Sequence, residues 1–198
     1  MTSEAASPLN FHVLPATPDR WPDLETLFGE QGAYGGCWCM WWRLKQSEFS
    51  RQTGQGNKQA LKAIVDSGEV PGLLAYVGSQ PIAWCSVGRR ESFGRLERSR
   101  TLKRVDDKPV CSIVCFFIAR PFRGQGVMAK LLRAAVEYAR QHGARIVEAY
   151  PVEPEKSLSG YAGYTGVAST FLKAGFAEVA RRKSGRQPIM RYFVGEDN

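Results

Sequence analysis

The sequence contains no long apolar run. None of its stretches approaches the roughly 20 apolar residues that a membrane-spanning helix needs. The first residues, Met-Thr-Ser-Glu, lack the basic and apolar pattern of a secretion signal. We therefore expect a cytoplasmic protein with no membrane partner. A chain of 198 residues can bury one good core, so we expect a single domain over 1–198, with 1–9 as a loose N-terminal tail.

Metal ligands and disulfide patterns are also scarce. The two histidines, His12 and His142, lie far apart and far from the closely spaced Cys37 and Cys39, so we expect no metal site. The cysteines are odd in number and lack the spacing of a disulfide framework, which suits a reducing compartment. They are Cys37, Cys39, Cys85, Cys111 and Cys115.

Acidic residues are fewer than basic ones, 19 against 27, which gives a net charge of +8. Such a charge suits nucleic acid, an anionic membrane surface or an anionic small ligand. The basic residues are spread along the chain, without recognition-motif spacing or a basic stripe interleaved with aromatic residues. We therefore expect no nucleic-acid partner and favour a small anionic ligand; salt-dependent DNA binding would contradict this interpretation.

The most informative stretch runs from Cys111 to Gln141. An apolar strand over 111–119 is followed by the turn Arg120-Pro-Phe-Arg-Gly-Gln-Gly126. Apolar residues then recur at helical spacing from Met128, and Gly143 provides a stop. A helix N-terminus presents unpaired N–H groups and a positive dipole end, so this arrangement predicts an anion-binding cradle.

The glycine turn identifies the anion. It lacks the Gly-Lys-Ser/Thr end of a nucleoside triphosphate loop, and its glycine spacing differs from the dinucleotide fingerprint. It resembles the acetyl-CoA pyrophosphate loop of the GNAT family of N-acetyltransferases, Arg/Gln-x-x-Gly-x-Gly/Ala, and reads Arg123-Gly124-Gln125-Gly126-Val127-Met128. Met128 departs from that pattern. Because it also opens the apolar stripe of the helix, we expect its side chain to turn into the core and leave its amide free.

The order of the predicted elements is also similar to that of the GNAT fold, as is the helix-to-strand junction from Phe171 to Phe176. The resemblance implies an α/β (α+β) fold with a mixed central sheet of six to seven strands flanked by about four helices. The central strand and the strand over 144–150 would splay apart to hold the cofactor. We expect residues 47–57 to form a polar connection. Further strands are expected near 11–14, 72–77, 81–87, 175–179 and 186–194, and further helices near 17–28, 57–67 and 167–173.

The resemblance implies an enzyme that moves the acetyl group of acetyl-CoA directly to a primary amine in a ternary complex, without a metal. Main-chain groups of the central strand would pair with the pantetheine arm, at Phe116, Phe117 and Ile118. The turn and the helix start would hold the pyrophosphate, through Arg123, Gly124, Gln125, Gly126, Val127 and Met128.

The catalytic groups are less evident. Many relatives carry a tyrosine four residues before the junction glycine, where this chain has Phe171. The proton for the departing thiolate would then come from solvent or from a nearby tyrosine, namely Tyr164, Tyr150 or Tyr161. Two carboxylates, Glu148 and Glu153, are candidate bases. Cys115 lies on the cofactor strand, but without a nearby histidine it is expected to pack as a small apolar residue.

The acceptor side is predicted from an aromatic cluster between Tyr34 and Arg43. Its tryptophans, Trp38, Trp41 and Trp42, are typical either of a core or of a pocket wall. The family resemblance favours the wall. With the basic background, we expect a small amine, or an acceptor with its own negative charge, rather than a polycation; a peptide acceptor and a cation-binding aromatic cage stay open.

One further functional alternative remains. A non-enzymatic acyl-CoA sensor of the same fold would keep the cofactor loop without proton-handling groups, which Phe171 favours. The sequence is compatible with a monomer or a homodimer.

Overall fold

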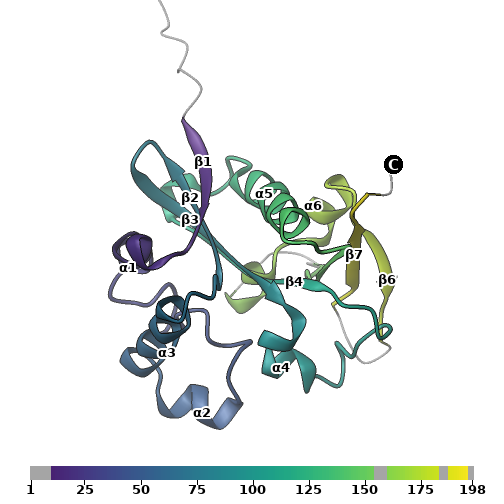
Figure 1. Ribbon diagram of the computed structural model, residues 1–198, viewed down its shortest axis with the longest axis horizontal. Coiled ribbons are helices and arrows are strands. Elements are labelled where there is room, and N and C mark those ends of the chain that lie inside the picture. Colours follow the sequence, from purple (N-terminus) through teal and green to yellow (C-terminus); the bar gives the residue numbers. More distant parts are fainter. Residues whose placement is uncertain (1–9, 154–159, 183–186, 196–198) are drawn as a thin grey trace, which may run out of the picture.

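The computed structural model describes residues 10–153, 160–182 and 187–195. Within them the chain forms a seven-stranded sheet with the order β1-β2-β3-β4-β5-β7-β6 (Figure 1). The β4–β5 pair is parallel, and the other neighbouring pairs are antiparallel. The expected mixed sheet is confirmed. The strands are β1 (Phe11–Pro15), β2 (Gly72–Val77), β3 (Gln80–Arg89), β4 (Cys111–Ile118), β5 (Ile146–Ala149), β6 (Ala177–Ala180) and β7 (Ile189–Phe193). The predicted tail, 1–9, lies outside the described residues.

The described residues contain six α-helices where about four were expected. They are α1 (Trp21–Phe28), α2 (Gln46–Arg51), α3 (Gln55–Asp66), α4 (Gly94–Glu97), α5 (Val127–Gln141) and α6 (Ala168–Lys173). The prediction of a polar connection over 47–57 is wrong, because α2 and the start of α3 lie there. The short polar α2 is held by a tertiary contact: the Phe49 ring packs edge to face on Trp41, with centroids 5.2 Å apart. None of the described helices is long and apolar enough to cross a membrane.

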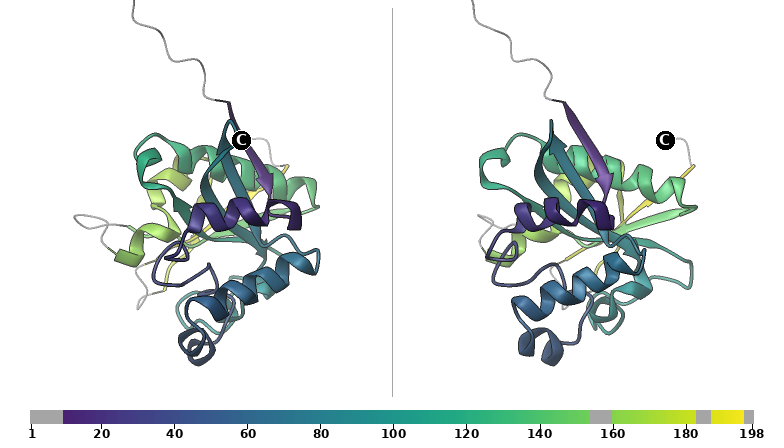
Figure 2. Two further views of the ribbon diagram at one scale, coloured as in Figure 1. Left: turned by 90° about the vertical axis from the view of Figure 1, so that its left-hand side faces the viewer. Right: turned by 60° about the vertical axis from the view of Figure 1, so that its left-hand side comes forward.

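The helices cover both faces of the sheet (Figure 2). The helices α5 and α6 pack on one face, where Leu131, Leu132 and Phe171 join apolar strand residues in the largest core cluster. The helices α1 and α3 cover the other face, where Leu24 and Leu61 pack with Trp84. Both layers follow from apolar residues at helical spacing.

A bulge in β4 sets which of its side chains face which layer. Ser86 of β3 lies opposite Cys115, but the next residue, Val87, lies opposite Ile113, so Val114 is an extra residue. Beyond the bulge, Cys115 and Phe117 face the α1 side, whereas Phe116 faces the α5 side. The bulge therefore changes which residues of the second half of β4 face each side of the sheet.

Candidate active site

The sheet opens along β4. The parallel β4–β5 ladder consists of Cys111 with Val147, Ser112 with Glu148 and Ile113 with Ala149, and it ends there. The remaining residues of β4, up to Ile118, continue alongside β3 without a partner on β5 (Figure 1). The expected splay of these two strands is present.

The backbone of β4 presents hydrogen-bonding groups to this opening. The Ala119 N–H donates to the Ile82 carbonyl at 2.9 Å. Because main-chain groups alternate in direction along an antiparallel strand, those of Phe117 point toward β3, and those of Phe116 and Ile118 point away from it. The Ile118 carbonyl accepts a 2.8 Å hydrogen bond from Arg123 Nε. The open edge can therefore pair with an extended ligand through Phe116 and the Ile118 N–H.

The glycine turn follows directly. Gly124 and Gly126 have φ of 76° and 72°, in the left-handed region that favours glycine. A Cβ at either position would meet nothing within 4 Å, so the turn faces open space. Gln125 Nε2 donates to the Pro121 carbonyl at 2.8 Å, which braces the turn. Gly126 caps α5, whose first N–H groups lack partners within the helix, so an anion can approach them closely.

The side chain of Met128 points inward. It packs against the core cluster on the α5 side. A Cβ added to Gly166 would lie 2.8 Å from Met128 Cε, which places the thioether beside the loop that follows Thr165. The bulky residue therefore leaves the turn unobstructed and its own amide available.

A cavity of about 720 Å³ adjoins the open half of β4. Rings dominate its wall, contributed by Tyr34, Trp41, Trp42, Phe49, Phe117 and Tyr164. Its polar lining includes Gln46, Thr165 and Gln187. Among the described residues that line it, none is a carboxylate, a lysine, an arginine or a histidine. The wall is therefore aromatic and uncharged, and it suits an apolar acceptor.

The three predicted acceptor-binding tryptophans separate in space. Trp41 and Trp42 line the cavity. Trp38 is only 4% exposed and packs in the core against the rings of Trp21 and Phe28, at centroid distances of 6.0 and 5.5 Å. Trp38 and Cys39 have positive φ of 45° and 53°, so the segment turns sharply there. This reversal buries one tryptophan and leaves two on the wall.

Tyr164 is the predicted proton donor that the structure brings to the cavity. It lies in the 3₁₀-helix Gly160–Thr165 with its ring 5.4 Å from that of Tyr34. Burial raises the pKa of Tyr164, and the positive charge of Arg123 opposes this effect. Its hydroxyl therefore keeps its proton at neutral pH. The side chain of Tyr161 lies outside the described residues.

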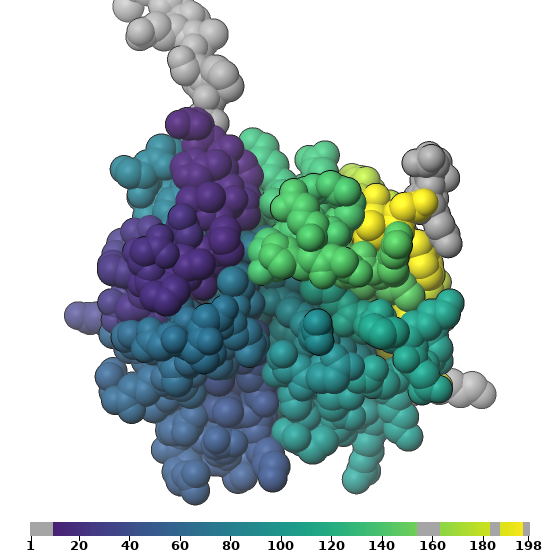
Figure 3. Space-filling model, viewed as in Figure 1, coloured from purple at the N-terminus to yellow at the C-terminus, as the bar shows by residue number. Residues whose placement is uncertain are grey.

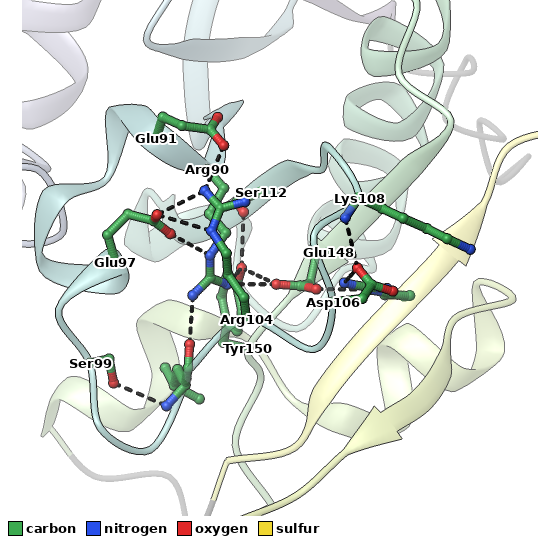
Figure 4. A network of polar contacts seen from close by, with 12 residues as sticks. Arg90, Glu91, Glu97, Ser99, Arg104, Asp106, Lys108, Ser112, Glu148 and Tyr150 are labelled. Carbon is green, nitrogen blue, oxygen red and sulfur yellow. Dashed lines mark hydrogen bonds and ion pairs between the residues drawn. The ribbon is translucent and has the colours of Figure 1, made fainter.

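Glu148 and Tyr150 lie elsewhere, in a buried ionic network (Figure 4). Glu148 accepts hydrogen bonds from Arg90 Nη1 and Arg191 Nε, both at 2.7 Å. The Tyr150 hydroxyl donates to the same carboxylate at 2.6 Å and accepts from Arg90 at 2.8 Å. Both side chains are almost fully buried, and neither lines the cavity. This geometry corrects their prediction as acid and base, because every oxygen of the pair is engaged in holding the fold.

The other sequence candidates are also engaged. Glu153 is paired with Arg181, and its pKa is lowered by that contact. Cys37, Cys39 and Cys115 border the cavity, with the Sγ atoms of Cys39 and Cys115 3.8 Å apart. Burial raises the pKa of Cys37 to about 11. The contact with Cys115, together with burial, also raises the pKa of Cys39 well above its usual value, so the thiols of Cys37 and Cys39 stay neutral. The described residues contain no cluster able to hold a metal ion.

Sequence reasoning missed much of the cavity wall. Phe49, Gln46, Thr165 and Gln187 come from segments far apart in the chain, and no local pattern marks them. The aromatic Tyr34–Arg43 segment, the central strand and the candidate acid Tyr164 were the parts of the wall that the sequence indicated.

The comparisons with known proteins agree with this geometry. The split sheet beside a glycine turn at a helix N-terminus is the arrangement that the resemblance to the GNAT fold predicts. The sequence model of the Acetyltransferase (GNAT) family matches residues 38–159. The chain therefore belongs to this family, whose general activity is acyl-CoA-dependent acetyl transfer. No curated protein sequence matches the chain.

Solved structures share the fold at low identity. One is a GNAT-family acetyltransferase from Listeria monocytogenes 4b F2365, with TM-score 0.57 and 10% identity over 93% of this chain and 95% of that one. Another is the PaiA N-acetyltransferase of Thermoplasma acidophilum in complex with coenzyme A, with TM-score 0.53 and 12% identity over 93% and 99%. A third is the ribosomal-protein-alanine N-acetyltransferase of Brucella melitensis, with TM-score 0.53 and 17% identity over 92% and 99%.

Proposed function

We propose that this protein transfers the acetyl group of acetyl-CoA to the amine of a small-molecule acceptor, directly within a ternary complex. The observation that carries the proposal is the continuity of three features: the exposed glycine turn, the unpaired edge of β4 and the aromatic cavity beside it. A phosphate-bearing arm held at the turn would extend along β4 and end at the cavity.

The chain's residues fit acetyl-CoA, which supplies the thioester. The N–H groups at the start of α5 and the guanidinium of Arg123 suit the pyrophosphate. The main-chain groups of Phe116 and Ile118 suit the amides of the pantetheine arm. The coenzyme A complex of the Thermoplasma relative supports this ligand.

The cavity would receive the acceptor as a neutral amine. Its described wall offers no carboxylate or histidine to remove a proton, so the fraction of amine already deprotonated in solution reacts. Tyr164 lines the same cavity as Cys115 and Phe117 of β4, beside which the thioester would lie. Its raised pKa suits it to donate a proton to the departing thiolate.

Ligand-dependent melting tests the cofactor assignment. Acetyl-CoA and free CoA should each raise the melting temperature in a saturable way, whereas ATP should not, because only a ligand that binds the native state stabilises it. Absence of a shift with all three would contradict the proposal. A melting shift with no release of CoA in the presence of any amine would instead favour the acyl-CoA sensor. The fully buried Phe171, which has no proton to donate, is consistent with that alternative.

Replacing Tyr164 with phenylalanine should lower kcat by about a hundredfold, because the thiolate then leaves without a positioned acid. In the unmodified enzyme, kcat/KM should rise with pH as the acceptor loses its proton. At pH values up to about 10, kcat/KM should show no decrease from loss of the Tyr164 proton, because the pKa of Tyr164 is raised above the ordinary tyrosine value. CoA release measured across pH with two amines of different pKa checks both points.

Tyr138→Phe is the matched control, since it removes a hydroxyl from a half-buried ring on α5 outside the cavity. Equal kcat in Tyr164→Phe and Tyr138→Phe would exclude Tyr164 as the acid. A large loss in Tyr34→Phe alone would assign the role to the other ring of the pair.

A further inference from the structure

Arg95 on α4 lies behind the cavity wall. Its guanidinium carbon is 3.7 Å from the centre of the Trp41 ring, and its Nη1 donates to Gln46 Oε1 at 2.6 Å. Trp41 and Gln46 both line the cavity. In the space-filling view, the blue segment that contains α2 meets the teal segment that contains α4 (Figure 3). Arg95 therefore joins the two segments at the edge of the acceptor space.

This guanidinium has no acidic partner in the described part of the chain. Its Nε and Nη2 atoms are buried and make no hydrogen bond. The well-shielded guanidiniums of Arg43, Arg90 and Arg191, by contrast, each pair with a carboxylate. Burial and the neighbouring charge of Arg98 both lower the pKa of Arg95. An anion at this position would relieve both effects.

Gln46 marks where such an anion would bind. Its neutral amide oxygen accepts from Nη1, where a carboxylate oxygen would make a stronger, charge-assisted bond. The Gln46 side chain is exposed, so it can move aside by giving up this bond and the 3.2 Å bond from its Nε2 to Ser50 Oγ. A carboxylate entering from the cavity would then meet Nη1 and the unpaired Nη2 in the two-pronged geometry that arginine favours.

Resting on the proposed function, we infer that the acceptor is an amine that carries a carboxylate beside an aromatic or large apolar body, and that Arg95 binds this carboxylate. A free aromatic amino acid is the simplest member of this class. The rings of the wall would hold the apolar body, and the described lining residues provide no carboxylate to hold a second cation. Polyamines are therefore disfavoured.

Matched pairs of probes test the inference. L-phenylalanine is compared with 2-phenylethylamine, and L-tryptophan with tryptamine, each rate being referred to the concentration of unprotonated amine. The carboxylate-bearing member of a pair should have at least a tenfold higher kcat/KM, mainly through KM. Equal use of both members, or preference for the decarboxylated one, would overturn the inference.

Variants separate a binding role from packing on Trp41. Arg95→Met keeps the apolar length of the side chain and should bring the ratio within each pair close to one. Arg95→Lys keeps the charge and should retain part of the preference, and Arg100→Gln, which removes an exposed charge on the segment after α4, should retain all of it. If Arg95→Met lowers kcat/KM for both members equally, Arg95 only supports the wall and the inference fails.

The inference can also be tested apart from turnover. If acetyl-CoA does not bind and no CoA is released, the proposed function fails. Melting temperatures measured with each of the four probes, without acetyl-CoA, then decide whether the carboxylate site exists. Stabilisation by the two amino acids, absent with the two amines and lost in Arg95→Met, would support the carboxylate site. Equal shifts, or no shift with any probe, would overturn it.

Discussion

Replacing Glu148 with alanine should remove a large part of the protein's stability toward unfolding. The carboxylate lies between two buried guanidiniums, those of Arg90 and Arg191. It also accepts a hydrogen bond from the Tyr150 hydroxyl, and Figure 4 shows it beside Arg90 and Tyr150. Removing one member of a buried ion pair typically costs about 3–5 kcal/mol, because the partner's charge remains in the interior. This loss is comparable with the roughly 5–15 kcal/mol that stabilises an ordinary domain. Urea unfolding followed by circular dichroism measures it.

The location of Glu148 explains why the effect should be large. Arg90 follows β3, Arg191 lies on β7, and Glu148 lies on β5 opposite Ser112, one pair before the β4–β5 ladder ends. The carboxylate thus connects three strands at the closed end of the opening. Arg191 extends the network to Asp106, with bonds of 2.7 and 3.0 Å.

Two comparisons make the Glu148 experiment decisive. Glu137→Ala removes an exposed carboxylate that pairs with Arg140 on α5, and it should change stability little because water screens such a pair. Glu148→Gln keeps the shape and should fall between the two. If Glu148→Gln unfolds like the unmodified protein but loses turnover, Glu148 is catalytic after all, and the structural interpretation is wrong.

The partners of Glu148 in this network could not be predicted from the sequence. Side chains alternate along a strand, so Glu148 and Tyr150, two residues apart, lie on the same face, and the Tyr150 hydroxyl contacts the Glu148 carboxylate. Their partners, Arg90 and Arg191, come from 58 and 43 residues away, and only tertiary folding brings them together. A carboxylate in a strand therefore looks the same in sequence whether it acts on a substrate or neutralises two arginines.

Local patterns predicted the parts of the site that local physics determines. The strand expected over 111–119, the glycine turn and the helix expected from Met128 each depend on neighbouring residues. The strand forms over Cys111–Ile118 and the helix begins at Val127, each within a residue of its expected end. The segment around Trp38 did not follow a local rule. Its turn at Trp38 and Cys39 uses left-handed backbone that side chains disfavour, so contacts with Trp21 and Phe28 must impose it.

Replacing Gly126 with alanine should weaken acetyl-CoA binding by about 10- to 100-fold. Gly126 caps α5 at φ 72°, and a Cβ there would project into open space rather than into protein. That space lies in front of the helix N-terminus, where the pyrophosphate is proposed to bind. The methyl group would displace the phosphate from one or two amide donors, and each factor of ten corresponds to about 1.4 kcal/mol.

Gly143→Ala is a closely matched control at the other end of the same helix. Gly143 has φ 80°, and a Cβ there also meets nothing within 4 Å. Both substitutions place alanine in left-handed backbone, so both should lower stability by about 1 kcal/mol. Only Gly126→Ala should reduce the melting shift produced by acetyl-CoA. Dissociation constants unchanged from the unmodified protein in both variants would show that acyl-CoA does not use the N-terminus of α5, whereas a similar loss in both would indicate damage to the helix as a whole.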